Sequence, residues 1–201
     1  MIEIKPIKLE GNWATGFALD LHTSSSKLLA NGKYDTTYTP MGKLMHGLKY
    51  ENKKEYADEI ADVAGKFVDD YFLKAKNKKK IDMIIPVPPT KQDRKYQPVD
   101  LLAQKIAIRT GIICSQFIVK RRKGYNEIKS EEDPIKREKA LKDAFFITTP
   151  KAKAFIKGKF VLLIDDVYRS GETLNAIGML LRQSGAKCVY VLTVTKTRTK
   201  R

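Results

Sequence analysis

Cysteine and histidine are scarce in this 201-residue chain, which contains two of each. Cys114 and Cys188 lie far apart, inside or beside apolar runs that indicate strands, so we expect reduced thiols in the core. Two cysteines exclude a framework of several disulfides and a four-cysteine zinc site. Because only His22 and His46 could be added, a His/Cys metal cluster is excluded as well, and any metal must bind through oxygen atoms.

Long apolar runs are also missing. None approaches the roughly 20 residues that span a bilayer, so the sequence predicts no membrane segment and no membrane partner. Residues 1–13 alternate apolar and charged side chains and lack the pattern of a secretory signal, from which we expect a cytoplasmic location. The apolar share of 42% and the charged share of 31% are typical of a soluble globular chain with one sizeable core.

Negative charge is in short supply. The chain has 39 Lys and Arg residues against 23 Asp and Glu residues, a formal net charge of +16. Such a field attracts polyanions and phosphorylated small molecules. A basic, solvated surface would have the same composition, so the charge by itself leaves both interpretations open.

From residue 81 onward, short apolar runs alternate with helical stripes. Strands rich in Val, Ile and Leu that are separated by helices indicate a parallel sheet covered on both faces, so the predicted fold class is α/β. The predicted strands are residues 81–87, 117–119, 145–147, 160–165 and 189–194, and the predicted helices contain residues 41–51, 56–71, 99–107 and 174–181.

Two regions depart from this alternation. Apolar positions in 2–4 and 17–21 predict a small antiparallel element, whereas the polar segment 23–38 predicts a surface loop. Residues 120–143 are highly charged and longer than an ordinary connection, which indicates a functional flap or disorder.

The segment FVLLIDDVYRSGETLNAIGMLL, residues 160–181, is the most informative. A buried strand leads into Asp165 and Asp166, then into a short loop and a helix. In open parallel sheets, ligands gather outside the carboxyl ends of the strands. The two carboxylates can accept hydrogen bonds from a sugar diol.

The loop that follows has the components of a phosphate site. Gly171 lets the backbone bend closely, Ser170 and Thr173 supply hydroxyls, and the helix start offers N–H groups. Diol and phosphate ligands together predict a site for a phosphorylated pentose. The alternative is a strand that merely enters a helix through a Ser-Gly cap.

This segment resembles the signature of the type I phosphoribosyltransferases, which bind 5-phosphoribosyl pyrophosphate (PRPP). The resemblance implies a mainly parallel sheet flanked by helices, with a hood lobe at residues 1–50, a core at 51–201 and a flexible loop at about 120–143. It implies transfer of the phosphoribosyl group to an unidentified nitrogen acceptor with release of pyrophosphate. Mg²⁺ is then expected to be held by PRPP oxygens, without direct protein ligands. A homodimer is compatible with such a fold.

The resemblance also assigns roles to residues. Asp165 and Asp166 are the diol ligands and the implied catalytic residues. Arg169 stands where several purine-salvage members have an acid, which disfavours purine salvage. The implied PRPP-binding set is Asp165, Asp166, Val167, Arg169, Ser170, Gly171, Glu172 and Thr173, and the pyrophosphate set is Pro88, Thr90, Lys91, Lys120, Arg122 and Lys123, with Arg137 as a further candidate.

Three other segments resemble the ComF competence-protein branch of this family. They are residues 86–107, 46–58 and 129–147, so the likeness covers about residues 40–197. The sequence departs from that branch in lacking its four-cysteine zinc element. It also has Arg94-Lys95-Tyr96-Gln97-Pro98 in place of an Arg-Gly-aromatic-Asn-Gln segment.

Other functions stay open at this point. The same loop could serve a regulator that senses PRPP without catalysis. The net charge, with the basic runs at 74–80 and 196–201, would suit a competence factor that binds single-stranded DNA. In the predicted hood, Trp13, Phe17, Tyr34 and Tyr38 are candidates for core packing or for stacking on an acceptor.

Overall fold

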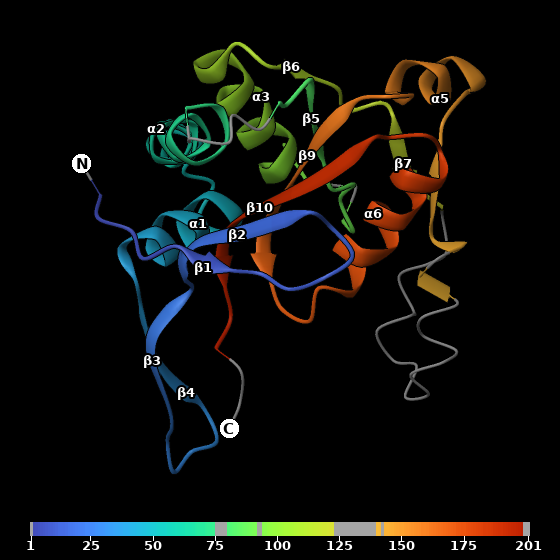
Figure 1. Cartoon of the computed structure of the whole chain (residues 1–201). Helices are drawn as coiled ribbons and strands as arrows, with labels where there is room; N and C mark the ends of the chain where they lie inside the picture. The colour runs from blue at the N-terminus through green and yellow to red at the C-terminus, as the bar shows by residue number, and fades with distance from the viewer. Residues whose placement is uncertain (1, 75–79, 92–93, 123–139, 142, 199–201) are drawn as a thin grey trace.

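The computed structural model describes residues 2–74, 80–91, 94–122, 140–141 and 143–198. Its centre is a six-stranded sheet of order β1-β2-β10-β9-β5-β6 (Figure 1). β1 runs antiparallel to β2, and the other four pairings are parallel. The strands are β1 (Ile7–Lys8), β2 (Thr15–Leu21), β5 (Met83–Pro86), β6 (Ile113–Cys114), β9 (Phe160–Tyr168) and β10 (Cys188–Lys196).

Helices cover both faces of this sheet (Figure 1). One face carries α1 (Pro40–Tyr50), α2 (Tyr56–Val68), the π-helix η1 (Asp69–Leu73) and α3 (Pro98–Thr110). The other carries α5 (Pro150–Ile156) and α6 (Glu172–Gln183). These findings confirm the predicted α/β class, and α2 with η1 confirms a long helix from residue 56.

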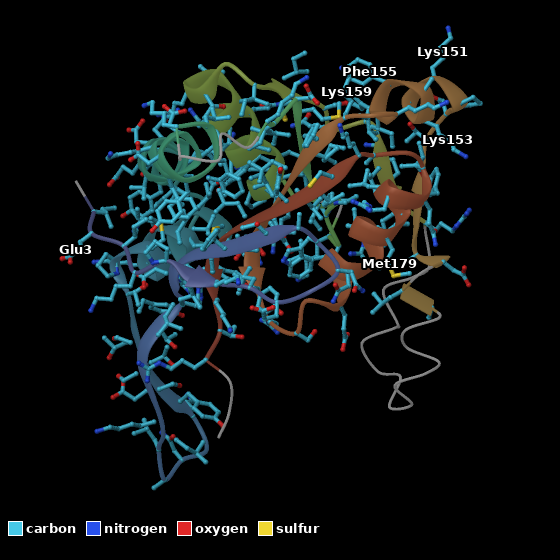
Figure 2. The ribbon with its side chains drawn as sticks, viewed as in Figure 1. Glu3, Lys151, Lys153, Phe155, Lys159 and Met179 are labelled. Atoms are coloured by element: carbon cyan, nitrogen blue, oxygen red, sulfur yellow. The ribbon has the colours of Figure 1, made fainter. Side chains whose placement is uncertain are left out.

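Two hydrophobic cores result from the alternation of side chains along the central strands. In β9, Leu162 and Ile164 pack towards α1, α2 and α3, whereas Val161 and Leu163 pack towards α6. All four are at most 1% exposed, so β9 is buried on both faces. Figure 2 shows side chains filling the space between the sheet and its helices.

The segment 23–38 was wrongly predicted as a loop. It forms an antiparallel hairpin of β3 (Thr23–Leu28) and β4 (Tyr34–Tyr38), which projects away from the sheet (Figure 1). Because both faces of this ribbon are largely exposed, it has no apolar alternation from which strands could be predicted.

Two predicted strands lie outside the parallel sheet. β7 (Val119–Arg121) and β8 (Phe145–Ile147) pair with each other, antiparallel, as a separate ribbon. Helix α5 lies between residues 147 and 160, where no element was predicted. Most of the expected flexible loop at 120–143 lies outside the described residues.

The N-terminal segment contributes directly to the central sheet. β2 pairs in parallel with β10, and α1 packs in the core on one face. The predicted strand around Ile2 and Ile4 is instead at Ile7–Lys8. The division into a hood at 1–50 and a core at 51–201 stays a prediction. Within the described part of the chain, no helix is long and apolar enough to cross a membrane.

Helix α1 begins at a tight contact with the end of β2. The Thr39 hydroxyl donates to the Leu21 carbonyl at 2.6 Å and accepts from the Gly42 N–H at 2.9 Å. A Cβ on Gly42 would overlap the His22 carbonyl oxygen. Glycine therefore lets α1 approach the sheet closely enough to bring its last residues to the strand ends.

We predict that Gly42→Ala destabilises the protein by about 1–3 kcal/mol, because the backbone oxygen of His22 cannot move aside cheaply. Gly178→Ala is the matched control. It lies within α6, where the nearest atom to an added Cβ is 3.6 Å away, so alanine should stabilise by up to about 1 kcal/mol. Urea denaturation measures the free energy of unfolding of both variants. Equal changes for the two substitutions would contradict the packing argument.

Candidate functional site

A cleft of about 600 Å³ opens at the carboxyl ends of β5 and β9. Two strand-to-helix segments form its walls: one joins β5 to α3 and the other joins β9 to α6. The end of α1 and one residue of β7 complete it. The lining residues are Lys49, Tyr50, Val87–Lys91, Arg94, Gln97–Asp100, Arg121, Leu141 and Asp165–Leu174.

Strand β9 extends three residues further than the sequence predicted. Asp165, Asp166 and Val167 lie within it, since β10 stays paired with β9 as far as Tyr168. The Asp166 N–H donates to Asp165 Oδ1 at 2.8 Å. Both carboxylates therefore project from a strand whose backbone is fixed, which gives them defined positions in the cleft.

The loop after β9 turns sharply at Gly171. This residue has φ of 80°, in the left-handed region that favours glycine, and it is the N-cap of α6. No side chain caps the first turn. The helix start thus presents backbone N–H groups and a partial positive charge to the cleft, beside Ser170, Glu172 and Thr173.

The N-terminal segment braces this loop, a feature that the sequence did not reveal. The Tyr168 hydroxyl donates to the Glu10 carbonyl at 3.3 Å, and the Trp13 ring packs edge-on against Tyr168. The Asn12 N–H donates to Asn175 Oδ1 at 2.7 Å. These contacts join the turn before β2 to both flanks of the loop between β9 and α6.

The two carboxylates differ in their surroundings. Asp166 forms an ion pair with Lys49, and both side chains are largely buried, at 15% and 21% exposure. Burial, and next the negative charge of Asp166, raise the pKa of Asp165 to about 8 against the opposing effects of Lys49 and Arg121. The Lys49 ammonium therefore offsets negative charge at this carboxylate pair.

On the β5 side of the cleft, Pro88, Thr90 and Lys91 line the wall as predicted. The Val87 N–H donates to the Ile164 carbonyl at 2.8 Å, which fixes the start of this loop against β9. The Gln97 side-chain amide donates to the Lys91 carbonyl at 3.0 Å. The loop is therefore held at both ends.

The predicted Lys120 and Arg122 do not line the cleft. The Lys120 ammonium lies 5.2 Å from the centre of the Phe117 ring, and Arg122 Nε donates to the Asp143 carbonyl at 3.0 Å. Successive side chains of β7 point to opposite faces, so the residue between them, Arg121, faces the cleft instead. Lys123 and Arg137 lie outside the described residues.

Arg121 is partly buried, with its guanidinium 4.6 Å from the centre of the Phe145 ring. Its Nε is buried and has no hydrogen-bond partner among the described residues. Burial lowers the pKa of Arg121, whereas the charge of Asp165 raises it. A cation with an unused donor beside the cleft is suited to bind an anionic ligand.

Sequence reasoning missed several cleft residues, among them Lys49, Tyr50, Arg94 and Arg121. Lys49 and Tyr50 lie in a segment with family resemblance, but no local pattern distinguishes them from other surface residues of a helix. Of the four hood aromatics considered, none lines the cleft.

Those four aromatics have other surroundings. Phe17 packs against Phe67 and the α2 core, Tyr38 lies between His22 and His46, and Tyr34 is exposed on the hairpin. Trp13, as described above, braces Tyr168.

Comparison with known proteins agrees with this geometry. The family model described as the phosphoribosyl transferase domain matches residues 49–201. Competence protein F of Haemophilus influenzae is 29% identical over 180 residues, which are 88% of this chain and 75% of that protein. The DNA utilization protein YhgH of Salmonella typhi is 27% identical over 167 residues, which are 80% of this chain and 69% of that protein.

A solved structure shows the same fold. The adenine phosphoribosyl transferase of Trypanosoma brucei matches at a TM-score of 0.52 and 15% identity, over 95% of this chain and 74% of that chain. The glutamine PRPP amidotransferase of B. subtilis is a much longer protein, of which the match covers 28%, at 17% identity and a TM-score of 0.45.

The family match includes the whole cleft as well as the strands that support it. Both predicted levels of resemblance, to the phosphoribosyltransferases and to the competence proteins among them, are confirmed. The chain belongs to the phosphoribosyltransferase family and has the type I fold.

Proposed function

We propose that the protein binds PRPP in the cleft and transfers its 5-phosphoribosyl group to a nitrogen acceptor, releasing pyrophosphate. One observation carries this proposal. A carboxylate pair, a helix start with a glycine turn and a set of cations line a single cleft of about 600 Å³, which is large enough for such a ligand.

Each part of PRPP has a matching part of the cleft. The 5′-phosphate would lie on the loop Ser170–Thr173, where backbone N–H groups face it. The ribose hydroxyls would donate to Asp166 and Asp165. The pyrophosphate would lie between Thr90 and Lys91 on one side and Arg121 on the other.

The chemistry follows from these positions. The C–O bond between the anomeric carbon and pyrophosphate breaks, and its electron pair leaves with the pyrophosphate. The lone pair of the acceptor nitrogen forms the new C–N bond. A nitrogen that bears a hydrogen then loses that proton to solvent, whereas a pyridine-type nitrogen, which has none, stays positively charged. Lys91 and Arg121 stabilise the negative charge of the leaving group, and Asp166 stabilises positive charge on the ribose ring.

Mg²⁺ is part of this proposal. Among the described residues, no group of three or more His, Cys, Asp or Glu side chains could hold a metal ion, so Mg²⁺ would be held by the oxygens of PRPP, beside Asp165 and Asp166. When bound with PRPP, Mg²⁺ would supply charge neutralisation that makes pyrophosphate a better leaving group.

We predict that PRPP with Mg²⁺ raises the melting temperature of the wild type and leaves that of Asp165→Asn/Asp166→Asn unchanged. At a hundredfold excess over Kd the ligand stabilises by about 2.7 kcal/mol, which raises the melting temperature of a chain of this size by about 5–11 °C. Asp35→Asn, which removes an exposed hairpin carboxylate, is the control and should respond like the wild type.

The outcomes of that experiment separate the candidate functions. No rise for the wild type, with the double variant still folded, contradicts PRPP binding. A rise accompanied by pyrophosphate release in the presence of mixed nucleobases supports the transferase. A rise without pyrophosphate release from any acceptor favours a PRPP-sensing regulator.

A second prediction tests the assignment of Arg121. Arg121→Gln should weaken PRPP binding tenfold or more, since a hydrogen bond to a charged group contributes about 1.5–3 kcal/mol. Lys120→Gln, its neighbour facing away from the cleft, should leave binding unchanged. Isothermal titration measures both. Ribose 5-phosphate, which lacks pyrophosphate, should bind Arg121→Gln as it binds the wild type, and an equal loss for both ligands would refute the assignment.

A second candidate function is non-specific binding of single-stranded nucleic acid. Phe155, which is 48% exposed, lies on α5 with Lys151 and Lys153, and Lys159 directly precedes β9 (Figure 2). This basic patch lies at the opposite end of β9 from the cleft. Lysines beside an exposed ring suit a phosphate backbone with stacking bases.

For this function we expect a mobility shift with single-stranded DNA that weakens steeply with salt. Replacing Lys151, Lys153 and Lys159 by Gln should reduce the slope of log K against log salt by about 2. The control is the same replacement at Lys27, Lys33 and Lys43, which are exposed elsewhere. Equal losses in the two triple variants would mean that general charge, and not this patch, binds the strand.

A further inference from the structure

The corner of the cleft beside Asp166 contains an exposed aromatic ring. Tyr50, the last residue of α1, is 61% exposed and yet lines the cleft. Lys49 Nζ lies 5.9 Å from the centre of this ring and at the same time forms the ion pair with Asp166. The ring is therefore next to the carboxylates at which the proposed function places the ribose.

This corner is built from two segments that are tied together. The Tyr96 hydroxyl donates to the Leu48 carbonyl, which joins the loop before α3 to the end of α1. As a result the Arg94 guanidinium lies 5.9 Å from the centre of the Tyr50 ring. The ring of His46, 5.1 Å away on the same helix, supports Tyr50 from within α1.

Tyr50 is not needed for the core. The buried residues of α1 are Met41, Gly42, Leu44, Met45, Gly47 and Leu48, whereas Tyr50 faces the cleft. An exposed, supported ring in a ligand cleft offers a flat surface on which another aromatic ring can stack.

The charges of the corner favour an anionic ligand. Lys49 is already paired with Asp166, and Lys91 and Arg121 flank the expected pyrophosphate. Arg94 forms no ion pair with any described residue. Its guanidinium can bind a carboxylate through two parallel hydrogen bonds.

We propose that Tyr50 and Arg94 form the acceptor subsite, and that the acceptor is a planar aromatic ring bearing a carboxylate. The ring stacks on Tyr50, the carboxylate binds Arg94, and a nitrogen of the acceptor faces the anomeric carbon. This inference rests on the proposed PRPP-binding function and names the substrate class of the same site.

The test compares acceptors that differ in one carboxylate. The pairs are orotate with uracil, nicotinate with nicotinamide, and anthranilate with aniline. Binding is measured by isothermal titration on protein saturated with ribose 5-phosphate, pyrophosphate and Mg²⁺, an unreactive substitute for PRPP. In at least one pair the carboxylate should bind ten times more tightly than its neutral partner, and it should also release pyrophosphate from PRPP.

Two variants assign the roles. Arg94→Gln should remove the tenfold preference for the carboxylate and leave binding of the neutral partner unchanged, whereas Tyr50→Leu should weaken both partners alike. Arg198→Gln, which removes an exposed cation outside the cleft, should change neither. Circular dichroism confirms that each variant is folded.

The failures are distinguishable. If PRPP raises the melting temperature but no carboxylate binds better than its neutral partner, the acceptor assignment is wrong and the PRPP function stands. The same holds if Arg94→Gln weakens both partners equally. If PRPP itself does not bind, both proposals fail.

Discussion

The ion pair between Lys49 and Asp166 connects the end of α1 to the last part of β9 in the lining of the cleft. Two adjacent carboxylates in a largely buried position repel each other, and burial adds to the cost of charging them. The positive charge of Lys49 offsets the free-energy cost of ionising Asp166. Asp165 has no such ion pair, and burial beside Asp166 raises its pKa, which favours the neutral form. The position of α1, and hence of Tyr50, is coupled in this way to the carboxylate pair.

Other contacts also position α1 and the two carboxylates around the cleft. Gly42 allows α1 to approach β2, and the extended pairing of β9 with β10 carries Asp165 and Asp166 beyond the core. The Tyr96 hydroxyl fixes the loop before α3 against α1. Each contact joins distant parts of the sequence. Together these contacts fix the positions of the separate segments that line the cleft.

The sequence predicted the parts of this site that are local. The strand, the acidic pair and the Gly171 turn lie within one stretch of chain, so their spacing alone indicated a sugar-phosphate ligand. Arg121 illustrates what is not local. The basic run around it was recognised, but which of its residues faces the cleft depends on the pairing of β7 with β8, which no composition reveals. Lys49 and Arg94 depend likewise on tertiary contacts, and the β3–β4 hairpin was missed because both of its faces are polar.

Strand β2 lies between β1 and β10 in the sheet. A strand from the beginning of the chain therefore pairs with β10, which is far away in the sequence. Contacts between such distant segments form late, because a long stretch of chain must first be ordered. The turn at Glu10–Trp13, which holds Tyr168 and Asn175, is attached directly to β2. During synthesis the loop between β9 and α6 would therefore lack these contacts until β10 has emerged and the sheet is complete.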